Sequence, residues 1–242
     1  MNSKEKMLES AIKALVIKDI FLKENNATAI SNNFVIDEFS VANFSRRVDL
    51  IHSRNNKIFA YEIKSEFDSL SRLKGQVDEY LTHFDKVTVV AAPRHIDKAL
   101  LLTPKHVAVW EVAGSKLKIV RRGKILPITD KMKFIRMMTL IELLSLAKKS
   151  NIEIKDKKRK IVELSLLSIP TKYLREEAIN NLKIRYSKRE LNYYDANNYN
   201  NYGQSGKAEP RKKILQTRNI DSLIHAIEKL QTQFKSDITL TK

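Results

Sequence analysis

Residues 46–64 read RRVDLIHSRNNKIFAYEIK, and the other predicted elements can be arranged around this stretch. Two runs rich in β-branched and aromatic residues flank a polar pair of asparagines at positions 55 and 56. Asparagine tolerates the positive φ angles that a two-residue hairpin turn requires. We therefore predict a β-hairpin with Arg54 opposite Lys57.

This register brings two carboxylates and an ammonium together. It places Asp49 opposite Glu62 and Arg47 opposite Lys64, and Glu62 and Lys64 share a face because side chains alternate along a strand. Paired Cβ atoms lie about 5 Å apart, and two carboxylates at that distance raise each other's pKa. Mg²⁺ can offset this repulsion, and a neighbouring lysine can orient a water molecule. A surface hairpin with a cross-strand salt bridge explains the same spacing, so these residues alone leave both interpretations open.

The motif resembles that of the PD-(D/E)XK nuclease superfamily: an aspartate, twelve intervening residues, then Glu62-Ile63-Lys64. Val48 stands where the motif usually has proline. A longer string resembles a family of small bacterial and phage PD-(D/E)XK proteins, and a related bacterial DNA-repair family with an Arg-Arg-Ala-Asp-Leu segment. That string comprises Glu38-Phe39-Ser40, Arg46-Arg47-Val48-Asp49-Leu50, Tyr61-Glu62-Ile63-Lys64-Ser65, Asp68, Leu70, Arg72-Leu73, Gln76 and Tyr80.

The resemblance implies an α/β fold with a restriction-endonuclease-like mixed sheet flanked by helices. It also implies a Mg²⁺-dependent deoxyribonuclease, most simply an endonuclease, in which Mn²⁺ can substitute and no small-molecule cofactor is needed. Its setting would be DNA repair, recombination, phage replication or defence. The alternative is a non-catalytic DNA-binding module on the same fold.

The resemblance also assigns roles to residues. The expected metal ligands are Asp49, Glu62, Glu38 and the carbonyl of Ile63. Lys64 would position the attacking water, and Gln76 would lie beside that lysine. Some members of the superfamily supply a further glutamate from the first helix. Glu9 falls nearly opposite the apolar stripe predicted for that helix, which favours a solvated role.

The charge of the chain indicates a polyanionic partner. Its 242 residues carry 45 Lys and Arg against 28 Asp and Glu, a net charge of +17. Residues 126–242 hold 24 of these cations and 13 of the acids, so the second half is the more basic. DNA is the expected partner, with a membrane surface as the competing interpretation. The candidate DNA contacts are Arg46, Arg47, Arg72, Lys74, Lys157, Lys158 and Arg159.

Composition excludes several classes of site. The chain has no cysteine, which removes disulfides and thiolate ligands. With five glycines it offers no P-loop or dinucleotide-binding motif. No stretch approaches the roughly 20 apolar residues of a spanning helix, so we expect a cytoplasmic protein that does not enter membranes.

Hydrophobic periodicity predicts the elements around the hairpin. A helix over 4–24 should bury Met7, Leu8, Ala11, Ile12 and Leu15. Glu38 should end a strand whose preceding residue, Asp37, points to the other face. A helix over 66–83 should follow the hairpin, then a buried strand, a short helix near 95–102 and a second hairpin around residues 113–114. These elements complete a nuclease-like domain over residues 1–125.

The rest of the chain divides into three parts. Residues 126–187 should form a small all-helical module with helices over 130–149, 155–168 and 171–186. This module resembles SAP or Rho-N-terminal modules, which bind nucleic acid; a helical lid packed on the nuclease core is the alternative. The Asn- and Tyr-rich residues 188–218 indicate a flexible linker. Residues 219–242 should form a helix and tail, through which a protein partner or a second copy could bind.

Overall fold

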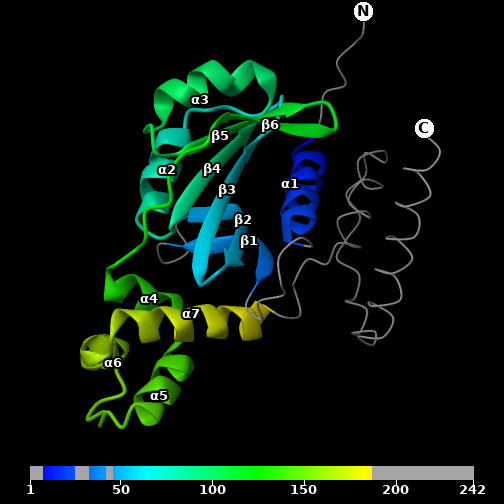
Figure 1. Ribbon diagram of the computed structural model, residues 1–242. Helices are drawn as coiled ribbons and strands as arrows, with labels where there is room; N and C mark the ends of the chain where they lie inside the picture. Colours follow the sequence, from blue (N-terminus) through cyan, green and yellow to red (C-terminus); the bar gives the residue numbers. More distant parts are fainter. Residues whose placement is uncertain (1–7, 25–32, 42–45, 187–242) are drawn as a thin grey trace, which may run out of the picture. The chain divides into compact units, whose positions relative to one another are not determined.

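The computed structural model describes residues 8–24, 33–41 and 46–186, all within a compact unit spanning Met1–Gly206. Six strands form one sheet in chain order: β1 (Phe34–Val41), β2 (Arg46–Arg54), β3 (Lys57–Lys64), β4 (Lys86–Ala91), β5 (Ala108–Ala113) and β6 (Lys116–Arg121). Strands β3, β4 and β5 run parallel, and the other neighbours are antiparallel. The predicted mixed sheet flanked by helices, with further helices on its C-terminal side, is confirmed (Figure 1).

The hairpin follows the predicted register from its turn to Leu50, but the ladder does not reach the predicted pairs Asp49–Glu62 and Arg47–Lys64. Arg54 pairs with Lys57, and the ladder continues to Leu50 opposite Tyr61. The two asparagines of the turn, at positions 55 and 56, have φ angles of 50° and 58°. These are the left-handed values that favoured asparagine there.

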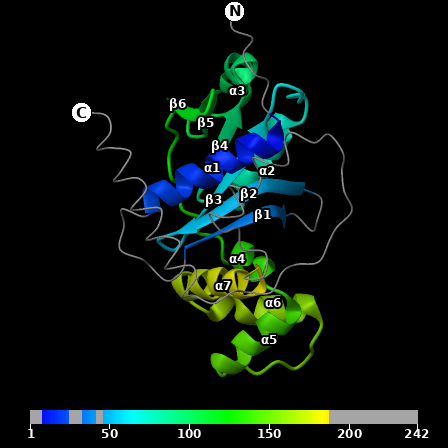
Figure 2. The ribbon, with the colours of Figure 1, turned by 90° about the vertical axis from the view of Figure 1, so that its right-hand side faces the viewer.

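Helices cover both faces of the sheet. Helix α1 (Glu9–Glu24) crosses one face, and α2 (Leu73–Leu81) and α3 (Ile96–Leu102, preceded by the 3₁₀ turn Pro93–His95) lie on the other (Figures 1 and 2). The core beneath α1 is the smaller of two hydrophobic clusters. The larger cluster lies between the sheet and α2 and α3, and it continues into the C-terminal helices.

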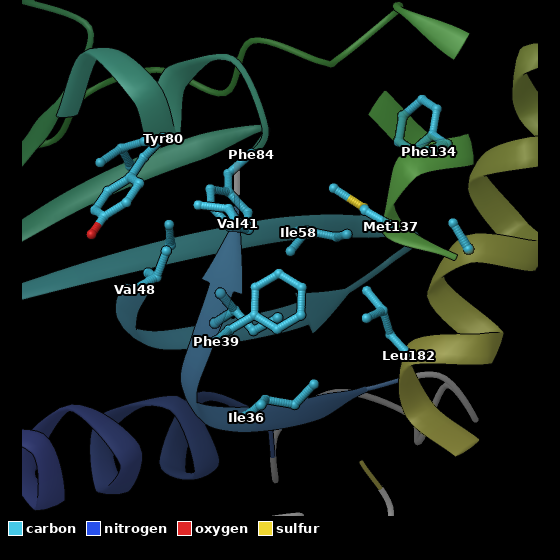
Figure 3. Close-up of a cluster of buried hydrophobic side chains, with 14 of the residues drawn as sticks. Ile36, Phe39, Val41, Val48, Ile58, Tyr80, Phe84, Phe134, Met137 and Leu182 are labelled. Atoms are coloured by element: carbon cyan, nitrogen blue, oxygen red, sulfur yellow. The ribbon is translucent and has the colours of Figure 1, made fainter. Parts of the chain in front are cut away.

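The C-terminal helices are α4 (Lys131–Met137), α5 (Leu140–Lys149), α6 (Arg159–Ser165, followed by the 3₁₀ turn Leu166–Ser168) and α7 (Thr171–Tyr186). They gather at one end of the sheet (Figures 1 and 2). Figure 3 shows Phe134, Met137 and Leu182 from these helices facing Phe39 and Ile58 of the sheet. This packing corresponds to the alternative of a helical lid on the sheet core.

Three predicted helices differ in their bounds, and the one expected over 155–168 begins only at Arg159. The helix expected over 130–149 is split in two, because Thr139 forms a capping box with Glu142 and begins α5 anew. The helix expected over 66–83 begins only at Leu73, since the Asp68 carboxylate accepts hydrogen bonds from the Ser65 backbone amide and hydroxyl and holds that segment as a loop. Within the part of the chain that the structure describes, no helix is long and apolar enough to cross a bilayer.

The apolar stripe predicted for the first helix was wrong in part. Leu8 is 45% exposed, whereas Val16, Ile17 and Ile20 are buried, and so is Lys13. The run ALVI at positions 14–17 is apolar on every side, so periodicity did not fix which face turns inward. The predicted linker 188–218 and the C-terminal helix and tail 219–242 lie outside the described residues, as do residues 1–7.

Candidate functional site

The candidate site lies where β2 and β3 part. Among the described strand positions, their ladder stops at Leu50 and Tyr61, one step before Asp49 and Glu62. Instead of pairing through its backbone there, Asp49 accepts a hydrogen bond at its Oδ2 from the backbone amide of Ile63, at 2.6 Å. The carboxylate of Asp49 is therefore held against β3 beside Glu62.

Glu62 and Lys64 form a buried pair on β3. Their side chains are 1% and 9% exposed, and the Lys64 ammonium donates to Glu62 Oε1 at 2.7 Å. The second oxygen of Glu62, Oε2, is buried and has no hydrogen-bond partner among the described residues. Gln76 and Tyr80 lie near it, but the Tyr80 hydroxyl donates to the carbonyl of Arg47 at 2.8 Å.

The protein compensates only part of this negative charge. Burial raises the pKa of Asp49 to about 7, and the charge of Glu62 adds to that increase despite the Ile63 hydrogen bond and Lys64. Burial also raises the pKa of Glu62, which Lys64, Tyr80 and Gln76 oppose. Burial and the neighbouring Glu62 raise the pKa of the Tyr80 hydroxyl, so it stays protonated as a donor. Among the described residues, the ammonium of Lys64 thus serves two carboxylates, of which Glu62 is buried and Asp49 half-buried.

Glu38 lies opposite Asp49 on β1, between the pairs Asp37–Leu50 and Phe39–Val48. Its φ of 56° is a strained value for a glutamate. This left-handed residue interrupts the alternation of side chains, so Ile36 and Phe39 both enter the larger core. The prediction that Asp37 points away from Glu38 was wrong for the same reason, since both carboxylates turn toward α1.

Lys13 of α1 joins these two carboxylates. Its ammonium lies 2.7 Å from Asp37 Oδ1 and 2.8 Å from Glu38 Oε1, and 3.8 Å from Glu9 Oε1. The other Glu38 oxygen, Oε2, contacts the Arg47 guanidinium. Both oxygens of Glu38 therefore lie beside cations of the protein, although Oε2 accepts no hydrogen bond among the described residues.

Glu9 is closer to the site than its predicted solvated role implied. One oxygen each from Glu9, Glu38 and Asp49 lie within 4.8 Å of one another. The helical wheel misplaced Glu9 because the buried stripe was assigned to the wrong positions. On the observed stripe Glu9 precedes the buried Lys13 by one turn, although its side chain remains 47% exposed.

The structure brings together the five predicted catalytic residues: Asp49, Glu62, Lys64, Glu38 and Gln76. Ile63 takes part through its amide, and the proposed role of its carbonyl as a ligand stays a prediction. Sequence reasoning missed Lys13. A charged residue one turn after Glu9 was the available signal for Lys13, but the misplaced stripe concealed it.

The predicted DNA contacts fall into two groups. Arg46, Arg47, Arg72 and Lys74 are exposed near the site, and an Arg46 nitrogen lies 3.8 Å from where a side-chain carbon at Gly75 would stand. The Arg46 side chain therefore extends from the start of β2 to Gly75 of α2. The second group, Lys157, Lys158 and Arg159, is exposed on the helical module.

Two cations of the second group are used within the protein. Lys158 pairs with Asp156 at 3.1 Å. Arg159 pairs with Glu163 at 2.7 Å and donates to the carbonyl of Met138 at 2.9 Å. Arg159 therefore has a structural role, and its role in DNA binding stays a prediction.

The fold and site define an α/β protein with a buried acidic pair and a lysine where two central strands part. The chain belongs to the family described as Bacteriophage P4 protein cII, which it matches over residues 2–206. It is 30% identical to Protein cII of Enterobacteria phage P4 over 187 residues, covering 75% of this chain and 69% of that protein. It is also similar to a protein of unknown function from Silicibacter pomeroyi, with a TM-score of 0.36 and 15% identity over 64% of this chain and 99% of that chain. A likeness at this level does not establish a shared fold.

Proposed function

We propose that this protein is a metal-dependent DNA nuclease of the PD-(D/E)XK type that acts in the cytoplasm. The observation that carries the proposal is the pair of carboxylates Asp49, half-buried, and Glu62, buried, for which Lys64 is the nearby ammonium among the described residues, bonded to Glu62. The family description names no reaction, so the proposal is supported by the chemistry of these residues and by the sequence resemblance.

The residues present fit a divalent cation. Glu62 Oε2 is a buried oxygen without a hydrogen-bond partner in the described part of the chain. Asp49 has one oxygen bound by the Ile63 amide and a pKa raised to about 7 by burial and by Glu62. Buried charges are ordinarily paired or bound to metals, and carboxylates are preferred ligands of Mg²⁺ and Mn²⁺. Asp49 and Glu62 would therefore hold the ion.

The side chains around this pair suit hydrolysis of a phosphodiester. A bound Mg²⁺ supplies Lewis acidity at the phosphate and lowers the pKa of bound water. Lys64 is fixed by Glu62 at 2.7 Å and can hold a water molecule or a phosphate oxygen with its other N–H groups. Gln76, whose Oε1 is buried without a partner among the described residues, can accept a hydrogen bond from that water.

The exposed cations beside the site suit a DNA backbone. Arg46, Arg72 and Lys74 are solvent-exposed on β2 and at the start of α2, the elements that carry Asp49 and Gln76. Such side chains contact phosphates irrespective of sequence. They would bring a phosphate toward carboxylates that otherwise repel it.

A cleavage assay tests the proposal, with linear, nicked, branched and single-stranded DNA in Mg²⁺ and in Mn²⁺. We expect metal-dependent cleavage that Asp49→Asn abolishes. Lys64→Met should retain Mn²⁺ binding and lose roughly 10²–10⁴ in rate, the typical contribution of a group that handles a proton or water. Asp78→Asn, which changes an exposed carboxylate of α2, is the matched control.

Two results would count against this function. Full cleavage by Asp49→Asn at ordinary Mg²⁺ would remove the acidic pair from the mechanism. If the protein binds DNA but cleaves none of these substrates, the non-catalytic DNA-binding module is favoured instead, whether or not the protein binds Mn²⁺.

A further inference from the structure

Lys13 occupies a position that is unusual for a lysine. Its residue is 6% exposed, and three carboxylates surround its ammonium at 2.7 Å, 2.8 Å and 3.8 Å: those of Asp37, Glu38 and Glu9. Lys13 is therefore a fixed positive charge.

The backbone is arranged around this contact. In a regular strand Asp37 and Glu38 would point to opposite faces, and only the positive φ of Glu38 turns both toward α1. Such a conformation is strained for a residue other than glycine. The hydrogen bonds to Lys13 offset that strain, so the strained strand and the buried lysine depend on each other.

The same carboxylates border the candidate metal site. Glu38 lies opposite Asp49 on the neighbouring strand, and Glu9, Glu38 and Asp49 each offer an oxygen within 4.8 Å of the others. Asp49 therefore stands between two groups of acids. Toward β3 it meets Glu62, whose Oε2 has no partner among the described residues. Toward β1 and α1 it meets acids that Lys13 already neutralises.

The geometry points to Lys13 as a built-in substitute for a second metal ion, so that the site binds one divalent cation, between Asp49 and Glu62, and not two. This inference rests on the proposed metal site. Lys13 is a positioning residue: its ammonium keeps Glu38 and Asp37 away from the divalent cation and neutralises charge that a second ion would otherwise neutralise.

Removing the Lys13 ammonium should create a binding site for a second divalent ion. In Lys13→Met the side chain keeps its length, but Asp37, Glu38 and Glu9 lose the cation they share. A divalent ion is the natural replacement for it. We therefore expect the variant to bind one ion more than the wild-type chain.

Titration calorimetry with Mn²⁺ on the full chain without DNA measures this stoichiometry. We expect one Mn²⁺ in the wild type, one in Lys13→Arg, and two in Lys13→Met. The double variant Lys13→Met with Glu38→Gln loses a ligand of the new site and should return to one. Lys18→Met, on the exposed side of the same helix, is the matched control and should bind one.

The outcomes separate this inference from the proposed function. Two ions in the wild type, or an unchanged count in folded Lys13→Met, overturns the role of Lys13 and leaves the nuclease proposal standing. If Lys13→Met is unfolded in chelator, folding on addition of Mn²⁺ supports the inference, and failure to fold at any Mn²⁺ concentration overturns it. No ion in the wild type overturns the metal site itself.

Discussion

Two buried acidic centres in this protein are compensated in opposite ways. Asp85, at the junction of the sheet and the helical module, is 2% exposed. It receives two hydrogen bonds from Arg175 at 2.7 and 3.0 Å, and one each from the amides of Ile58 and Ile128 at 2.8 and 2.9 Å. At the other centre, Asp49 and Glu62 share one ammonium and leave an oxygen of Glu62 without a partner among the described residues.

This difference indicates a structural role for Asp85 and a ligand-binding role for Asp49 and Glu62. At Asp85 the protein supplies both the counter-charge and the hydrogen bonds, and Arg175 in addition lies 4.6 Å from the ring centroid of Phe134. Such a centre joins α7 and α4 to the sheet and leaves no role for a ligand. At Asp49 and Glu62 the uncompensated charge is a cost of folding. A cation from solution is the expected compensation.

The largest effect should come from breaking the complete centre. Arg175→Met leaves Asp85 buried without its cation, and removal of one partner of a buried ion pair costs about 3–5 kcal/mol of folding free energy. Urea unfolding measures the loss. Lys172→Met, on the exposed side of α7, is the control and should change the free energy of unfolding little.

The comparison would fail if the two variants were equally stable. Asp85 would then be tolerated without its cation, and its hydrogen bonds to backbone amides would suffice. The contrast with Asp49 and Glu62 would lose its basis.

A smaller effect should come from completing the incomplete centre. At pH 8 and a free Mn²⁺ concentration about 100 times the dissociation constant, the wild type should gain about 2.7 kcal/mol in free energy of unfolding. The gain should shrink below pH 7, because protons compete with Mn²⁺ for Asp49, whose pKa burial and Glu62 raise to about 7. Urea unfolding with Mn²⁺ and with chelator measures it.

The double variant Asp49→Asn with Glu62→Gln should show no such gain, whereas Asp78→Asn should match the wild type. Equal stabilisation of the double variant would place the bound ion elsewhere on the protein.

The fold could be predicted from sequence where local rules and burial agree. The hairpin 46–64 combines a period of two with a turn of two asparagines, and its register followed directly. The first helix shows the opposite case, since residues 14–17 are apolar on every side and the buried face depends on the sheet it meets. The split after α4 depends on the capping box of Thr139 and Glu142, a signal that the apolar run around it concealed.

The candidate site shows the same limit. Asp49, Glu62 and Lys64 could be placed together because the register of the hairpin, extended one step beyond its last pair Leu50–Tyr61, brings Asp49 beside Glu62. The Lys13 contacts could not, because they require a left-handed Glu38, and the regular alternation assumed for a strand excludes that conformation. The bond of Arg175 to Asp85 spans ninety positions and no local pattern indicates it.

A further prediction uses the pH dependence of Asp49. Its pKa is about 7 in the folded chain, raised by burial and Glu62 from the value of 3.8 expected when unfolded. The folded state therefore binds the proton more tightly, and this residue lowers the free energy of unfolding as pH rises from about 4 to about 7. Asp49→Asn removes the charge while its amide oxygen can still accept from the Ile63 amide.

In chelator, Asp49→Asn should be as stable as the wild type near pH 4 and more stable by about 1–3 kcal/mol at pH 8. The full value for a pKa that rises from 3.8 to about 7 is about 4 kcal/mol, at about 1.4 kcal/mol per pKa unit, and we expect less because Asp49 is partly exposed. Urea unfolding across this pH range measures the difference. A variant less stable than the wild type at pH 8 would mean that the carboxylate of Asp49 stabilises the fold and needs no cation.

The smallest effect should come from Arg47, whose ion pair with Glu38 is exposed to solvent. It contacts Glu38 but is 69% exposed, and Lys13 already binds the other oxygen of that carboxylate. Exposed ion pairs contribute about 0–1 kcal/mol, so Arg47→Gln should lower the free energy of unfolding by less than about 1 kcal/mol, and by less still in high salt.

Mn²⁺ binding should be unchanged, since neither Asp49 nor Glu62 depends on Arg47 for its charge balance. If Arg47 also contacts a phosphate, the slope of log affinity for DNA against log salt should fall by about 0.9. Calorimetry, urea unfolding and a salt titration of DNA binding separate these three quantities, and loss of Mn²⁺ binding would show that the exposed arginine, and not Lys13, holds Glu38 away from the metal.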